Sequence, residues 1–147
     1  MRDFRFRLFV SLVVAIPAIC TVLVVAGAGD AQTRPGTGFN LPPDAADTKN
    51  PLTVDDKVLA AGKQVFSDKC QKCHGEKGLG DGPDADPDHA EEMNLTNPKR
   101  ADRNPDGVVF YKVSNGRRSP KMPAFKEELS KDQIWSVVSY VQTLRKK

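Results

Sequence analysis

The sequence predicts a helical domain, because helical signals recur along the chain and no strand-like run accompanies its cysteine motif. Apolar residues repeat at helical spacing from about residue 54 and again from residue 131. A shorter segment, about 105–114, begins with a proline and is followed by Asn115-Gly116, a helix stop signal. A chain of 147 residues is typical of one domain.

Apolar residues are unevenly distributed along the chain. Residues 1–29 contain 20 of them, whereas residues 30–147 contain 37 in 118 positions, or 31%. No segment after residue 29 is apolar enough to span a bilayer, which excludes a polytopic membrane protein. An ordinary globular domain is about 45–50% apolar with glycine included. Either much of residues 30–147 is disordered, or something other than side chains fills the core.

The first 28 residues combine a basic start with an uncharged apolar run at 8–28. The sequence Ala26-Gly27-Ala28 fits a signal-peptide cleavage site, but the run is also long enough to span a membrane. The head is therefore a signal peptide or an uncleaved membrane anchor. Both alternatives place the rest of the chain in the periplasm, or on the periplasmic face of the bacterial cytoplasmic membrane. The basic residues are Arg2, Arg5 and Arg7.

Residues 29–52 are rich in Gly, Pro, Asp and Thr, which predicts a flexible linker before a domain over residues 53–147. The first helix of that domain is expected to begin after Thr53 as N-cap. Gly62 lies on its apolar face, where it costs about 1 kcal/mol of helix propensity relative to Ala. A close crossing with another helix would explain it. The face consists of Val58, Leu59, Gly62, Val65 and Phe66.

Cys70 and Cys73 are followed directly by His74, which completes the C-x-x-C-H signature of c-type haem attachment. Two thiols in one helical turn are placed to add to the two vinyl groups of one porphyrin. The neighbouring imidazole then reaches the iron. We therefore predict one covalently bound haem c with His74 as its proximal iron ligand. We interpret the third cysteine, Cys20, as a small apolar residue of the apolar run at 8–28.

Three other interpretations of the cysteine motif remain open. A thioredoxin-like redox pair would need a βαβ setting, of which the surrounding sequence shows no sign. A structural zinc site would need a fourth ligand, and only the distant His89 is available. The third alternative is a chance occurrence of the pattern.

The second half of the chain contains loops and two further helices. Residues 75–104 are expected to be mostly loop, and Pro105 suits the first turn of the short helix. Ser130 and Gln133 form a predicted capping box before the last helix. Its expected apolar face comprises Ile134, Trp135, Val137, Val138, Tyr140, Val141 and Leu144.

The second axial ligand of the iron has three candidates, Met122, Met93 and His89. Met122 is favoured, because prolines on both sides stiffen its loop and it follows His74 by 48 residues, enough to reach the opposite haem face. His/Met ligation fills both axial positions and raises the reduction potential. It therefore predicts an electron carrier with no catalytic residue, rather than a haem enzyme or gas sensor with an open iron.

Taken as a set, these motifs resemble the class I c-type cytochromes, in particular small bacterial monohaem domains such as the haem-c domain of cbb3-type oxidase subunit III. The resemblance covers about residues 53–147. It implies an all-α cytochrome c fold, a few helices wrapped round one haem, whose terminal helices cross near Gly62, Phe66 and Tyr140. It also implies that the Pro83 carbonyl orients His74. The matching strings are GKQVF at 62–66, CQKCHG at 70–75, GLGDGP at 78–83, NLT at 94–96, Gly116, MPAF at 122–125 and VSYVQTL at 138–144.

The predicted function is single-electron transfer in an exported respiratory or oxidative chain. The alternative is a haem-c electron-accepting subunit of a membrane-associated dehydrogenase or terminal oxidase complex, held through residues 8–28.

The uneven distribution of charge along the chain predicts the kind of partner. Residues 76–92 carry seven acids and one base, while residues 99–147 carry twelve bases and five acids. A basic rim is expected to steer docking of an acidic redox protein. It comprises Arg117, Arg118, Lys121 and Lys126.

Two other ligand classes are disfavoured by the sequence. The alternating Asp84, Asp86 and Asp88 lack the glycine and glutamate that an EF-hand loop needs, which favours a solvated acidic loop. No aromatic residues alternate with the bases as in nucleic-acid-binding surfaces, so nucleic acid is not an expected partner.

Overall fold

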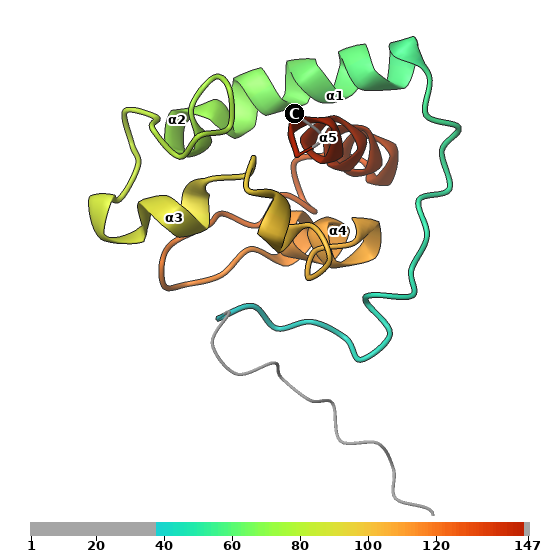
Figure 1. Cartoon of the computed structure of the whole chain (residues 1–147). Coiled ribbons are helices and arrows are strands. Elements are labelled where there is room, and N and C mark those ends of the chain that lie inside the picture. Colours follow the sequence, from blue (N-terminus) through green and yellow to red (C-terminus); the bar gives the residue numbers. More distant parts are fainter. Residues whose placement is uncertain (1–37, 146–147) are drawn as a thin grey trace, which may run out of the picture. The chain divides into compact units, whose positions relative to one another are not determined.

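The computed structural model describes residues 38–145, so the predicted head at 1–28 lies outside the described residues. Within that range the chain forms helices and a single isolated β-bridge, which confirms the all-α fold (Figure 1). No helix in this part of the chain is long and apolar enough to cross a membrane. The helical elements are α1 (Asp56–Lys69), α2 (Gln71–His74), η1 (Pro87–His89), α3 (Ala90–Met93), η2 (Pro98–Arg100), α4 (Asp106–Asn115) and α5 (Lys131–Leu144).

The helices α1 and α5 cross in direct contact, with α1 lying across α5 in Figure 1. The crossing point is Gly62, where an added Cβ atom would lie 2.0 Å from the Ser136 carbonyl oxygen. Only a residue without a side chain fits this approach, which explains a glycine in the middle of a helix. One turn further on, the rings of Phe66 and Tyr140 pack with their centroids 5.4 Å apart. The expected crossing is therefore confirmed.

The two long helices begin at side-chain caps. The predicted capping box of α5 is present, since the Ser130 hydroxyl accepts from the Gln133 N–H at 3.2 Å and the Gln133 side chain accepts from the Ser130 N–H at 2.9 Å. The predicted Thr53 cap of α1 is wrong. Asp55 caps this helix instead, because its carboxylate accepts from the Val58 N–H at 2.8 Å. An aspartate is at least as good a cap as a threonine.

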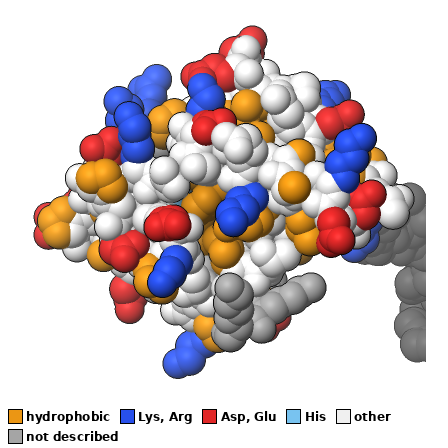
Figure 2. All heavy atoms as spheres, turned by 90° about the horizontal axis from the view of Figure 1, so that it is seen from above, with side chains coloured by type: hydrophobic (Ala, Val, Ile, Leu, Met, Phe, Trp, Pro, Cys, Tyr) orange, Lys and Arg blue, Asp and Glu red, His pale blue; other side chains and the backbone are white. Residues whose placement is uncertain are grey.

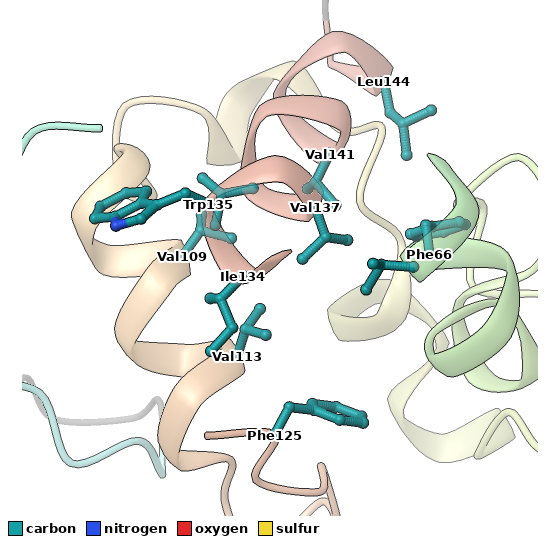
Figure 3. Close-up of a cluster of buried hydrophobic side chains, with 11 residues drawn as sticks. Phe66, Val109, Val113, Phe125, Ile134, Trp135, Val137, Val141 and Leu144 are labelled. Carbon is teal, nitrogen blue, oxygen red and sulfur yellow. The ribbon is translucent and has the colours of Figure 1, made fainter. Parts of the chain in front are cut away.

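The helix α4 packs against α5 beside the crossing. Pro105 is the N-cap of α4, so the helix begins one residue later than predicted, and Gly116 ends the helix as predicted. The Phe110 and Trp135 rings stack with centroids 4.2 Å apart, joining the two helices. Figure 3 shows the buried side chains that α1, α4 and α5 direct toward one another.

The segment between α2 and α4 is mostly irregular, as predicted, but contains the short turns η1, α3 and η2. Its last part is fixed to α5 by Arg145, a buried residue at the end of that helix. The Arg145 guanidinium donates to the Asn104 carbonyl at 2.9 Å, and Gln142 also donates to this oxygen at 3.2 Å. These bonds tie the loop to the C-terminal end of the helix.

The described part of the predicted linker, residues 38–52, lies against the helical domain. Phe39 and Ala45 are buried, and the Asn50 amide donates to the Ser139 hydroxyl of α5 at 2.9 Å. Gly107 of α4 lies so close to this segment that an added Cβ would stand 2.2 Å from the Ala45 carbonyl oxygen. Through Phe39, this segment contributes to the wall of the site described below.

Candidate functional site

The C-x-x-C-H motif lies where α1 passes into α2. Cys70 closes α1, with its N–H donating to the Phe66 carbonyl at 2.9 Å, and its own carbonyl accepts from the His74 N–H at 3.0 Å. Both cysteines and the histidine thus belong to one tight turn that continues from a helix fixed against α5. All three side chains line the same cavity.

His74 is oriented by a backbone carbonyl. Its Nδ1 lies 2.6 Å from the Met93 oxygen. A carbonyl oxygen only accepts, so Nδ1 carries the proton and the Nε2 lone pair is left for a metal. Burial lowers the pKa of His74, with the Met93 carbonyl opposing this and Arg117 reinforcing it, so the ring is neutral at neutral pH.

The expected role of the Pro83 carbonyl is therefore wrong. Pro83 is exposed, and its neighbour Asp84 donates its N–H to the Lys72 carbonyl at 2.8 Å. This bond holds the segment beside the cysteine turn, while the end of α3 reaches the edge of the imidazole. The backbone carbonyl of Met93 therefore orients the His74 ring.

Met122 lies on a loop that folds back onto the end of α4. Its N–H donates to the Arg117 carbonyl at 3.0 Å, and its carbonyl accepts from the Arg117 N–H at 2.9 Å. Gly116 permits this close return, because its φ is +59° and an added Cβ would lie 2.3 Å from the Met122 oxygen. The Phe125 N–H then donates to the Val113 carbonyl at 3.1 Å, which fixes the far end of the loop.

A cavity of about 470 Å³ joins these segments. The four residues predicted from the sequence, Cys70, Cys73, His74 and Met122, all line it. Met93 lines it as well, whereas His89 does not and lies instead 3.6 Å from the Glu92 carboxylate. Much of the wall is the apolar core shown in Figure 3. These core residues are Phe66, Val109, Val113, Phe125, Val137 and Val141.

The wall is completed by an aromatic ring and basic residues, none of which the sequence marks as part of the site. Two cations lie over the Phe39 ring, with its centroid 4.9 Å from Lys112 Nζ and 4.7 Å from Arg117 Cζ. Arg145 lines another part of the cavity. A porphyrin has apolar faces and two propionate carboxylates, so an apolar cavity with cations in its wall matches both of its parts. The residues present therefore fit a haem.

The chemistry of the cysteines also separates the alternative interpretations. Burial, reinforced by Cys73, raises the pKa of the Cys70 thiol to about 12. A reagent thiol of a redox pair needs a lowered pKa, so this environment opposes a thioredoxin-like role. No group of three or more His, Cys, Asp or Glu side chains within residues 38–145 is placed to hold a metal ion.

The expected basic rim is only partly at the surface. Arg118, Lys121 and Lys126 are exposed, but the Arg117 side chain is 10% exposed and pairs with Glu92. Placing Arg117 on the rim was therefore wrong, because its pairing with Met122 turns its side chain inward. The face that carries α1 mixes acidic and basic side chains (Figure 2).

Comparison with known proteins agrees with this geometry. Residues 59–145 match the cytochrome c family model. Cytochrome c6 of Rippkaea orientalis is 35% identical over 91 residues, which cover 56% of this chain and 67% of that protein.

Two solved structures are also similar. A chain of the reducing HAO-like protein complex of Kuenenia stuttgartiensis is 29% identical with a TM-score of 0.50, over 64% of this chain and 46% of that one. Cytochrome cL of Methylophaga aminisulfidivorans is 26% identical with a TM-score of 0.47, over 73% of this chain and 61% of that one. The chain thus spans less than two thirds of either solved chain. With the family match over most of its helical part, the chain belongs to the class I c-type cytochromes, which carry one covalently attached haem c.

Proposed function

We propose that this chain is a single-electron carrier. In this proposal Cys70 and Cys73 hold the haem through thioethers, and His74 and Met122 are its axial iron ligands. The observation that carries the proposal is the meeting of these four side chains, from two segments far apart in the sequence, on one cavity. The haem supplies a one-electron Fe(III)/Fe(II) couple.

The proposed ligand set determines the class of function. With His74 and Met122 both bound, the iron has no open position for a substrate or for O₂, and the chain itself transforms no substrate. Several backbone bonds fix the two ligand segments, which favours small rearrangement on electron transfer. Met93 is less suited as a ligand, because its carbonyl already lies 2.6 Å from His74 Nδ1, at the edge of the proximal ring.

The test of this proposal is exposure of the ferrous protein to carbon monoxide, together with a redox titration. We expect one reversible one-electron transition and no shift of the Soret band after mixing with the gas. Rapid formation of a carbon monoxide adduct would show an open iron position and contradict the electron-carrier proposal.

We further propose that the redox partner docks on the exposed bases near the Met122 loop, which are Arg118, Lys121 and Lys126. Charged rims raise association rates with partners of opposite sign, and salt weakens this effect. Ferricyanide, an anionic oxidant, serves as the probe.

Reversing one charge of this rim should slow oxidation of the ferrous protein by ferricyanide. The substitution Lys126→Glu is expected to lower the rate several-fold at low ionic strength and little at high ionic strength. The control Lys57→Glu makes the same charge change at an exposed position in α1. Equal slowing by both substitutions would show that net charge, rather than the rim, governs the reaction.

A second candidate function is that of an electron-accepting subunit in a larger assembly. The similarity to a chain of a protein complex from Kuenenia stuttgartiensis favours it. A membrane-associated dehydrogenase or terminal oxidase is the proposed type of assembly. For either function we propose export to the periplasm or its membrane face, supported by the basic and apolar residues 1–28.

A further inference from the structure

Arg117 bonds to Met122 through its backbone and to Glu92 through its side chain. Its N–H and its carbonyl both pair with Met122, at 2.9 and 3.0 Å. Its guanidinium Nη2 lies 2.6 Å from the Glu92 carboxylate and donates to it. The hydrogen bond from Arg117 lowers the pKa of Glu92, so this pair is charged at neutral pH.

Glu92 stands next to the residue that orients the other proposed ligand. The following residue, Met93, ends α3 and provides the carbonyl that lies 2.6 Å from His74 Nδ1. The Glu92–Arg117 ion pair therefore connects two segments, 25 residues apart, each of which is bonded to one of the proposed iron ligands.

The surroundings of the pair strengthen it relative to an ordinary surface ion pair. The Arg117 side chain is 10% exposed and that of Glu92 is 37% exposed. The Phe39 ring covers the guanidinium, with 4.7 Å between its centroid and Arg117 Cζ. Partial burial and a short charge-assisted bond make such a pair worth more than a solvated one.

We infer that the Glu92–Arg117 ion pair is a positioning clamp that keeps Met122 on the iron by tying its loop to the segment that orients His74. This inference rests on the proposed His74 and Met122 ligation. Without the clamp, the Met122 loop separates more readily from the haem face, and an external ligand replaces the thioether more easily.

The test is a titration of the ferric full-length holoprotein with imidazole, a small ligand that displaces a methionine. Loss of the far-red charge-transfer band of methionine-ligated ferric haem reports the displacement. Glu92→Gln and Arg117→Gln are each expected to raise the imidazole affinity about fivefold, the factor that one ion pair of this kind supplies. The double variant is expected to lie close to the single variants and well below the sum of their effects, because both substitutions remove the Glu92–Arg117 bond.

Two further variants separate the clamp from a general loss of structure. Arg117→Lys keeps the charge and is expected to restore most of the wild-type affinity. Glu91→Gln changes the exposed neighbouring carboxylate and is expected to change nothing. If Arg117→Gln fails to fold, Glu92→Gln carries the test, since an amide of the same size replaces the carboxylate.

The outcomes distinguish this inference from the proposal on which it rests. A wild-type protein without the far-red band would overturn Met122 ligation and the clamp with it. A wild-type band together with an unchanged imidazole affinity in Glu92→Gln would overturn the clamp alone. Additive effects in the double variant would also overturn it, because the two residues would then act independently.

Discussion

Replacing both Cys70 and Cys73 with alanine is expected to leave the chain without haem and without most of its helical circular dichroism. The haem site is a cavity of about 470 Å³ within the apolar core. Without the haem, the apolar side chains that line this cavity lose the group they pack against and face water. Small domains are stable by only roughly 5–15 kcal/mol, so the unfilled domain is expected to be largely unfolded.

The measurement is the far-ultraviolet circular dichroism and thermal unfolding of the full chain with and without these substitutions. Ser67→Ala, on the exposed side of α1, serves as the control and is expected to retain haem and a cooperative transition. A haem-free double alanine variant with native helix content and a cooperative transition would show that the side chains alone build the core.

Replacing Met122 with alanine should open one face of the iron. The far-red charge-transfer band is expected to disappear, and the ferrous protein is expected to bind carbon monoxide. The reduction potential should fall by on the order of 0.1 V, because a thioether ligand favours the ferrous state and axial ligands set the potential over a wide range.

Met93→Ala is the matched control, since the same residue type is removed from the wall of the same cavity. It should keep the far-red band and the potential of the wild-type protein while losing about 2–5 kcal/mol of packing free energy. The reverse pattern, with the band lost in Met93→Ala and kept in Met122→Ala, would assign the axial position to Met93.

The parts of the fold that depend on local signals were predictable from the sequence. Both bonds of the capping box join Ser130 and Gln133, which are three residues apart. The sequence pattern alone is therefore enough to predict this cap. Gly62 was recognisable as a helix crossing, because a glycine on an apolar helix face needs such a reason. At the start of α1 the sequence provides three residues that can cap a helix, Thr53, Asp55 and Asp56, and only the folded chain selects Asp55 over Thr53.

The parts of the site that depend on distant backbone contacts were not predictable. Any residue can provide a carbonyl, so no side chain marks Met93 as the partner of His74. Phe39 is a single aromatic residue in a segment without helical spacing, and nothing local indicates that it is buried. Arg117 was expected at the surface with its basic neighbours, because the sequence gives no indication that pairing with Met122 turns it toward Glu92.

The central claim is that Cys70 and Cys73 hold one haem covalently. Extraction of the purified protein with acidified acetone, followed by mass spectrometry of the polypeptide, tests it most directly. We predict that the haem stays with the protein, that the polypeptide mass increases by one haem, and that the modification maps to the segment containing residues 70–74. Haem in the acetone phase and a polypeptide of unmodified mass would contradict the claim.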